Sequence, residues 1–326
     1  MPALPIALTC GEPAGIGPEL AEQVWQELHQ DGPAFFLIGD VKHLPGSVPH
    51  VLIEDPSQAP AAMGEGLPVL GIDFGTKRIP GVPDPSHAKA VINTIERAVF
   101  YAQSGQAAGL CTLPIHKKAL KDGAEFAFPG HTEFLGHLGN VDNVVMMLAS
   151  PLLRVVPVTI HIALSDVPAA LTADLLEDTI RTTHTGLKRD FGIENPRLAI
   201  AGLNPHAGEG GVMGQEDIDL IIPVLEKLTR EGLDLRGPLP ADTMFHARAR
   251  ESYDAAICMY HDQALIPIKA LDFDRGVNVT LGLPFVRTSP DHGTAFDIAG
   301  KGLANPASTI EALKLAARMG AARKDA

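Results

Sequence analysis

Long apolar runs are missing from the 326-residue chain, because no stretch of about 18 apolar residues occurs in it. A membrane-spanning helix is therefore not expected. Cysteine is also scarce, and Cys10, Cys111 and Cys258 form neither a CxxC pair nor an even-numbered disulfide framework. The first residues carry no basic segment of the kind that begins a signal peptide. These absences together predict a reducing, cytoplasmic location.

Positive charge is in deficit, with 26 Lys and Arg residues against 39 Asp and Glu residues and a formal net charge of −13. A nucleic acid is excluded as a main partner, because neutralising its phosphates needs a basic surface. A small anionic ligand needs only a few well-placed cations, so that class of ligand stays open. The chain also lacks the GxGxxG pattern of a Rossmann dinucleotide site, and the glycine-rich segment GEPAGIG at residues 11–17 does not match it.

Apolar strand-like runs alternate with amphipathic helix-like segments along the chain. The runs typical of strands are residues 5–9, 34–38, 109–112, 144–148, 154–160, 198–201 and 255–259. The segments typical of helices are residues 18–28, 87–103, 171–190, 216–232 and 310–319. Strands separated by helices predict parallel pairing and a layered α/β architecture. The length is typical of about two domains.

Three histidines follow hydrophobic runs, at points where buried strands are predicted to end: His161, His206 and His261. Ligands bind at the carboxyl ends of strands in open α/β sheets. Three imidazoles would bind a divalent metal and leave a coordination position for a substrate oxygen. The alternative is three unrelated histidines in the core or at its rim. Asp242 and Asp262 could orient the imidazoles, or could be solvated or helix-capping carboxylates.

Lys269, Asn278 and Arg287 are polar residues in an otherwise apolar stretch. In an acidic chain such residues are candidates for binding carboxylate or phosphate, and the alternative is ordinary surface ion pairing. The glycine-rich loop at residues 202–214 could bring backbone N–H groups to an anion, or could be a surface connection. Thr132, which follows the turn FPGH, is typical of a helix N-cap, and this role is compatible with ligand binding.

Several longer blocks occur in the order GEPAGIGPEL, FPGHTEF, GLNPHAGEGGVMGQE, GPLPADTMF, MYHDQALIPIK and GVNVTLGLPFVRTSPDHGTAFDIAGKG. Over residues 6–320 they resemble the 4-hydroxythreonine-4-phosphate dehydrogenase family of vitamin B6 biosynthesis. The resemblance implies a fold like that of isocitrate and isopropylmalate dehydrogenases, with two α/β domains and a cleft between them. Residues 1–130 with 280–326 are expected to form the cofactor-side domain. Residues 131–279 are expected to form the central metal, substrate and dimerisation domain.

The functional residues of that family fall on matching residue types in this chain. Metal ligands are implied at His161, His206 and His261. Substrate-binding residues are implied at His131, Thr132, Lys269, Asn278 and Arg287. The block DHGTAFDIAGKG is similar to the cofactor loop of a superfamily that binds NAD(P) without GxGxxG, and it implies cofactor contacts at His292, Gly293, Thr294 and Asp297. Lys117 is implied to border the phosphate site, and Lys269 or Asp242 to relay the proton of the substrate hydroxyl.

The activity implied by the resemblance is oxidation of 4-phosphooxy-L-threonine at C3 by NAD or NADP, followed by decarboxylation to 3-amino-2-oxopropyl phosphate. The metal would be Zn²⁺, or else Mg²⁺, Mn²⁺ or Co²⁺; imidazole ligands favour a transition metal. A homodimer with the active site at its interface is also implied.

Two alternatives stay open. The substrate could be a related four-carbon sugar-acid phosphate such as threonate or erythronate 4-phosphate, or the protein could bind metal and phosphate without catalysis. An isocitrate- or isopropylmalate-type activity is disfavoured, because those enzymes hold their metal with aspartates.

Overall fold

The computed structural model describes residues 3–325. Two compact units divide the chain: residues 3–144 with 283–325 form the first, and residues 145–282 form the second. The boundaries expected from the sequence fall after residues 130 and 279. In the structure, residues 131–144 belong to the first unit. Each unit is described by itself.

The first unit is a parallel sheet covered by helices. Its strands are β1 (Ile6–Thr9), β2 (Phe35–Gly39), β3 (His50–Leu52), β4 (Leu67–Gly71), β5 (Gly109–Thr112) and β12 (Arg287–Pro290). Its helices are α1 (Gly17–Leu28), α2 (Ala59–Ala62), α3 (Ala88–Gln103), α4 (Lys117–Ala124), α5 (His131–Gly139) and α11 (Ala307–Asp325). The strand order is β3-β4-β2-β1-β5-β12, and every neighbouring pair is parallel.

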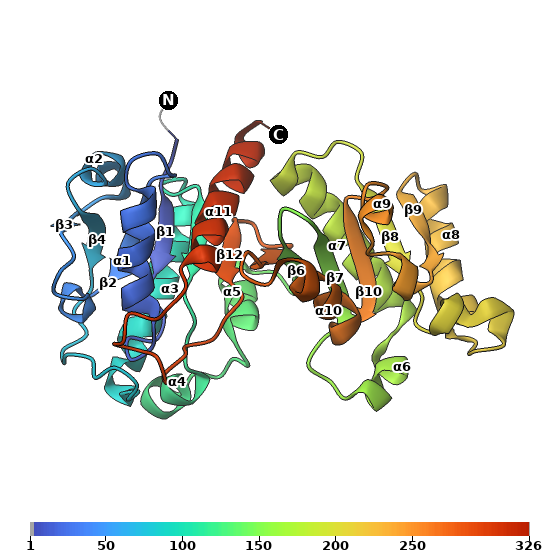
Figure 1. Ribbon diagram of the computed structural model, residues 1–326, viewed down its shortest axis with the longest axis horizontal. Helices are drawn as coiled ribbons and strands as arrows, with labels where there is room; N and C mark the ends of the chain where they lie inside the picture. Colours follow the sequence, from blue (N-terminus) through green and yellow to red (C-terminus); the bar gives the residue numbers. More distant parts are fainter. Residues whose placement is uncertain (1–2, 326) are drawn as a thin grey trace. The chain divides into compact units, whose positions relative to one another are not determined.

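Burial explains why these segments form strands. All residues of β1, β2 and β5 are buried, as expected for central strands that have helices on both faces. Helices α1 and α11 lie over one face of the sheet and α3 lies over the other (Figure 1). Thr9 lies opposite both Ile38 and Thr112, so β1, β2 and β5 bring their carboxyl ends to the same edge.

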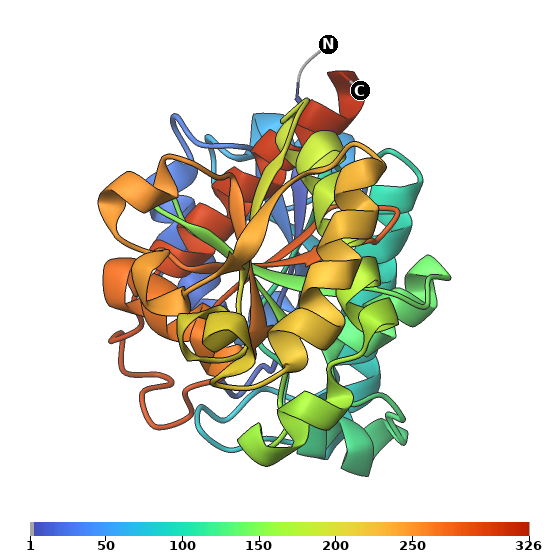
Figure 2. The same cartoon turned by 90° about the vertical axis from the view of Figure 1, so that its right-hand side faces the viewer.

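The second unit is a mixed sheet. Its strands are β6 (Val145–Ala149), β7 (Arg154–Thr159), β8 (Arg197–Ala201), β9 (Asp234–Leu239), β10 (Ala255–Tyr260) and β11 (Val277–Leu281). Its helices are α6 (Val167–Ala170), α7 (Ala173–Phe191), α8 (Ile222–Arg230), α9 (Ala247–Arg250) and α10 (His261–Asp272). The order is β11-β6-β7-β10-β8-β9, with helices on both faces (Figure 2). The core packs around β10, whose residues 255–259 are all buried.

Parallel pairing, the sequence-based prediction, is confirmed for the first unit and for β7, β10, β8 and β9. It is wrong for β6, which pairs antiparallel with both β7 and β11. Only residues 150–153 connect β6 to β7, and a parallel crossover needs a dozen or more residues. The short connection therefore closes a hairpin.

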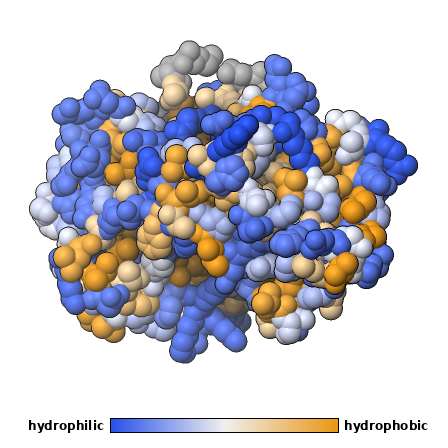
Figure 3. Space-filling model, turned by 45° about the vertical axis from the view of Figure 1, so that its right-hand side comes forward, coloured by the Kyte–Doolittle hydropathy of each residue, from blue (hydrophilic) through white to orange (hydrophobic). Residues whose placement is uncertain are grey.

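No helix within residues 3–325 is both long and apolar enough to cross a membrane. Hydrophobic and hydrophilic side chains alternate in small groups over the face that Figure 3 shows.

Candidate active site

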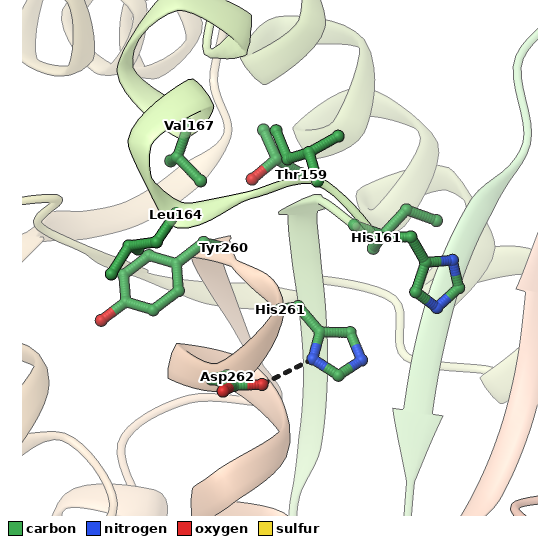
Figure 4. Close-up of a pocket in the computed structure, with 9 residues that line it drawn as sticks. Thr159, His161, Leu164, Val167, Tyr260, His261 and Asp262 are labelled. Carbon is green, nitrogen blue, oxygen red and sulfur yellow. Dashed lines mark hydrogen bonds and ion pairs between the residues drawn. The ribbon is translucent and has the colours of Figure 1, made fainter.

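His161 and His261 lie at the carboxyl ends of two neighbouring strands of the second unit. Tyr260 at the end of β10 pairs with Thr159 at the end of β7, so the residues that follow them emerge together. The two imidazole rings have centroids 5.6 Å apart, and Figure 4 shows them side by side. His161 has a φ of 53°, in the left-handed region that a non-glycine residue seldom adopts. Such strain is common at functional sites.

Asp262 orients the second imidazole. Its Oδ1 lies 2.7 Å from Nδ1 of His261, which is the dashed contact in Figure 4. With the proton on Nδ1, the Nε2 atom carries a lone pair that is available for coordination, as in metal-binding histidines. The orienting role predicted for Asp262 therefore has the required contact.

A pocket of about 240 Å³ adjoins the two histidines. Its walls are largely apolar, with polar groups contributed by the residues at the two strand ends. The lining residues are Thr159, Ile160, His161, Ile162, Leu164, Val167, Tyr260, His261 and Asp262 (Figure 4). The edge that carries the imidazoles thus includes space for part of a small molecule.

Gln263 fixes the start of α10 relative to its neighbours. Its side-chain oxygen accepts a hydrogen bond from the N–H of Met259, and its amide donates to the carbonyl of Gly202 at 2.8 Å. Thr159 adds a tie, because its hydroxyl donates to the carbonyl of Met259. These bonds hold the ends of β7, β10 and β8 in one arrangement.

His206 lies on a separate loop of the same unit. Its side chain is 61% exposed, and its Nδ1 is 3.1 Å from a carboxylate oxygen of Glu209. It does not line the pocket beside His161 and His261. Within the described residues 3–325, no three His, Cys, Asp or Glu side chains come close enough to hold a metal ion. The structure therefore brings two of the three predicted ligands together and leaves the third apart.

The loop that carries His206 is strained and anchored. Residues 206–210 all have positive φ, between 42° and 79°. A left-handed turn costs roughly 1 kcal/mol or more for each non-glycine residue. The buried carboxylate of Asp217 accepts hydrogen bonds from the N–H groups of Leu203 and Asn204 and from the Asn204 amide. Asp217 therefore holds the base of the loop in place.

The first unit contains a cluster of cations at the carboxyl end of β5. Arg287 is 4% exposed and donates from Nε and Nη2 to the hydroxyl of Thr112, at 3.2 and 2.8 Å. Burial lowers the pKa of Arg287 to about 10. Burial, and then the charges of Arg287 and Lys117, hold the pKa of His131 well below its usual range. Its Nε2 is buried without a hydrogen-bond partner. This arrangement favours the binding of an anion, which would offset both positive charges and accept from the imidazole.

Thr132 does not cap its helix, contrary to the sequence-based interpretation. Helix α5 begins at His131, its N-cap is Gly130, and no side chain caps it. Because Gly130 has extended backbone geometry and serves as the N-cap, the chain enters the helix two residues earlier than an N-cap at Thr132 would require. Thr132 lies in the first turn, beside His131, and its hydroxyl is not used as a cap.

The remaining predicted substrate and proton-relay residues lie in the second unit. Lys269 is half-buried on α10, and its ammonium lies 5.5 Å from the ring centroid of Phe273. Asn278 is half-buried on β11 opposite Leu148. Asp242 is exposed in a short 3-10 turn and does not line the histidine pocket.

The predicted cofactor residues lie together on an irregular loop of the first unit. The Nδ1 of His292 is 3.0 Å from the carbonyl of Gly293, its Nε2 is buried without a partner, and burial lowers its pKa. A Cβ added to Gly293 would meet no atom within 4 Å, so space adjoins the backbone there. Thr294 is half-buried and accepts a hydrogen bond from the N–H of Ile16, whereas Asp297 is exposed. The loop thus packs on the glycine-rich turn of residues 11–17.

Sequence reasoning did not assign a role to Asp217 or Gln263. Gln263 lies inside the block MYHDQALIPIK and Asp217 directly follows the block GLNPHAGEGGVMGQE, but each bonds to backbone groups that become its neighbours only in the folded chain. The sequence indicates Thr112 only as the end of a strand, although its hydroxyl accepts hydrogen bonds from the Arg287 guanidinium. The only sequence signal for Asp217 and Gln263 is their position: Asp217 follows the glycine-rich loop of residues 202–214, and Gln263 lies two residues after His261.

Two imidazoles beside a pocket and a glycine-rich turn lie at strand carboxyl ends, and the buried Arg287 reaches Thr112 at another. The chain is therefore an α/β protein of the class that binds small ligands at such ends. A family profile described as "Pyridoxal phosphate biosynthetic protein PdxA" matches residues 34–316. The chain therefore belongs to this family, as the sequence blocks predicted.

Similar proteins agree with this assignment over nearly the whole chain. A 4-hydroxythreonine-4-phosphate dehydrogenase of Roseobacter denitrificans is 62% identical, covering 97% of each chain. Solved structures of enzymes with this name align with TM-scores of 0.85 (Burkholderia phymatum, 39% identity, covering 98% of this chain and 99% of that chain) and 0.87 (Klebsiella pneumoniae, 34% identity, covering 98% of each). The predicted α/β fold of the isocitrate and isopropylmalate dehydrogenase type is confirmed.

Asp217→Ala should lower the free energy of unfolding by about 3 kcal/mol, because it leaves the partly buried N–H groups of Leu203 and Asn204 without their carboxylate acceptor. It should also speed hydrogen exchange in residues 203–212. Asp219→Ala removes an exposed acid two residues away and should change stability by no more than about 0.5 kcal/mol. Urea unfolding and exchange mass spectrometry measure both effects. Equal losses in the two variants would show that Asp217 does not anchor the loop.

His131→Gln should flatten the dependence of stability on pH. The folded chain keeps His131 neutral, so below pH 6.5 or so the unfolded chain binds the extra proton and the free energy of unfolding falls by about 1.4 kcal/mol per pH unit. The variant lacks this contribution, so its free energy of unfolding should rise relative to that of the wild type as pH falls from 7.5 to 5.5. Denaturation at several pH values tests this, with the exposed His50→Gln as control. Parallel curves for the wild type and His131→Gln would contradict it.

Proposed function

We propose that this protein is an NAD- or NADP-dependent dehydrogenase that oxidises 4-phosphooxy-L-threonine at C3, with decarboxylation to 3-amino-2-oxopropyl phosphate, in pyridoxal phosphate biosynthesis. The observation that carries the proposal is sequence similarity, over nearly the full length of the chain, to enzymes named 4-hydroxythreonine-4-phosphate dehydrogenase. The cation cluster of the first unit supports it, because the substrate carries both a phosphate and a carboxylate. All three cysteines are buried free thiols, which supports a reducing cytoplasm.

Arg287, Lys117 and His131 would anchor an anionic group of the substrate, and Thr132 would add a hydroxyl. A buried guanidinium forms directional, charge-assisted hydrogen bonds with phosphate or carboxylate oxygens. Thr112 already fixes Arg287 in one orientation, so little side-chain entropy is lost when an anion binds. Lys269 and Asn278 remain proposed contacts for the same substrate.

The donor set of the second unit fits a divalent metal in part. Two imidazoles bound to one tetrahedral ion by bonds of about 2.1 Å have their ring centroids roughly 5–6 Å apart, which matches His161 and His261. Asp262 leaves the Nε2 of His261 available to the ion. Imidazole favours Zn²⁺ or another transition metal over Mg²⁺. We propose the exposed His206 as the third ligand.

The loop of residues 292–297 fits a nicotinamide cofactor. It offers a buried imidazole nitrogen without a partner, at His292, and open space beside the backbone of Gly293. When bound, the metal supplies Lewis acidity and the nicotinamide supplies a hydride acceptor. The chain itself binds the substrate's charged ends, orients the imidazoles and accepts the hydroxyl proton. We propose that Lys269 or Asp242 accepts this proton. Normal turnover in a Lys269→Met enzyme would exclude Lys269 from that role.

A homodimer is part of the proposal. The second unit exposes large apolar side chains, among them Val212 at 82%, Phe273 at 70% and Ile266 at 64%. Val212 lies on the loop that carries His206. Exposed apolar groups of this size are typical of surfaces that pack against another protein. A second copy would cover them and would lie near the proposed third ligand.

Formation of NADH or NADPH at 340 nm, with 4-phosphooxy-L-threonine as substrate, tests the proposal. Chelation should abolish the rate, and added Zn²⁺, Mn²⁺, Co²⁺ or Mg²⁺ should restore it to different extents. Undiminished turnover after complete removal of metal would exclude the metal from the reaction.

Lys117→Met should raise the KM of the phosphorylated substrate about tenfold, the effect of one charge-assisted contact, while kcat changes little. The matched control is Lys118→Met, because Lys118 is also exposed at the start of α4 but pairs with Asp122 at 2.6 Å. Steady-state kinetics of the two variants measures the difference. Equal KM values in both would remove Lys117 from the substrate site.

A further inference from the structure

Glu19 is a buried acid that no part of the proposed chemistry uses. It lies in the first turn of α1, where the helix dipole favours a negative charge, and it is 6% exposed. Its two carboxylate oxygens accept hydrogen bonds from the backbone N–H groups of Gly300 and Gly302. Both bonds reach across more than two hundred and eighty residues of sequence, to the loop that follows β12.

The loop of residues 291–305 has little regular structure of its own. It consists of turns and irregular segments between β12 and α11, and Gly293, Gly300, Lys301 and Gly302 are exposed. Gly300 and Gly302 have φ values of 80° and 66°, which only glycine adopts without strain. Phe296 packs on His116, and Ala299 and Ala304 are buried, whereas residues 300–302 are exposed. The conformation of this exposed stretch therefore depends on the groups that bind its backbone.

Arg78 joins the same carboxylate to the glycine-rich turn. Its guanidinium lies 3.9 Å from Glu19, and it donates to the carbonyls of His43, Pro13 and Gly15. The turn and the loop also touch directly, because the N–H of Ile16 donates to Thr294. The Glu19–Arg78 pair therefore ties both backbone segments around the predicted cofactor residues.

We infer that Glu19 is a positioning residue for the nicotinamide cofactor: it binds the backbone of residues 300–302 and so holds residues 292–297 in the conformation that receives the cofactor. This inference rests on the proposed function, and it adds a residue that contacts neither the cofactor nor the substrate. The physical reason is preorganisation. A loop that is competent only part of the time binds its ligand more weakly, in proportion to the competent fraction.

Glu19→Gln keeps the size of the side chain but removes the charge and one of the two good acceptors. The dissociation constant of NAD⁺ or NADP⁺, measured by calorimetry on the full-length protein, should rise about tenfold, as expected when the competent fraction falls to about a tenth. The kcat at saturating cofactor and the KM of the phosphorylated substrate should stay within about twofold. Backbone amides of residues 292–305 should exchange faster in the variant.

Glu27→Gln is the matched control, because it removes the same charge from an exposed position of the same helix. It should leave cofactor affinity and loop exchange unchanged. Should Glu19→Gln fail to fold, the same measurements of cofactor affinity and amide exchange are made on Gly302→Ala. It strains the same loop at φ 66°, where an added Cβ meets no atom within 4 Å, and it leaves Glu19 intact.

Three outcomes separate the possibilities. If the wild type binds cofactor and Glu19→Gln binds it equally well, the inference is wrong, even when the variant unfolds at a lower temperature. If the affinity falls without faster exchange in residues 292–305, Glu19 does not act by holding this loop. If the wild type binds neither NAD⁺ nor NADP⁺, the proposed function itself fails, and the inference fails with it.

Discussion

Parallel strands in register end at the same edge of a sheet, where side chains from several strands meet and backbone pairing stops. Thr9 and Thr112 end level in the first unit, and Thr159 and Tyr260 end level in the second. His161 and His261 follow such an edge in the second unit, and in the first unit the Arg287 side chain reaches one from the start of β12. The alternation of strand side chains adds a further constraint in the first unit. Arg287 pairs with Leu110, so its side chain shares a face with Thr112 and can reach its hydroxyl.

Groups whose burial or backbone conformation opposes folding are concentrated at these edges. A buried guanidinium and a histidine held neutral beside two cations both oppose folding unless another group compensates them. The left-handed run at residues 206–210 adds backbone strain. The compensating groups are buried: Asp217 accepts through both carboxylate oxygens, and the hydroxyl oxygen of Thr112 accepts two bonds from Arg287. Cost at a ligand site, balanced by neighbouring bonds, is the pattern expected where function constrains the sequence.

The alternation of strand and helix segments predicted the α/β class and most element positions, because burial and periodicity are local properties of the sequence. The residue blocks predicted the family. Antiparallel pairing of β6 was missed, since the four-residue connection was not weighed against the general parallel pattern. The sequence favours Thr132 as the N-cap, but it cannot tell that Gly130 already serves as the cap two residues earlier. The ties made by Asp217, Gln263 and Glu19 were not predictable, because each joins backbone groups that are distant in sequence.

The amine distinguishes the proposed substrate, 4-phosphooxy-L-threonine, from the related sugar-acid phosphates. The most direct measurement is the ratio of kcat/KM for 4-phosphooxy-L-threonine to kcat/KM for threonate or erythronate 4-phosphate, followed at 340 nm with the same cofactor and metal. We expect a ratio well above one, with 3-amino-2-oxopropyl phosphate and CO₂ as products. A ratio below one, or no reduction of either cofactor with the amino substrate, would contradict it.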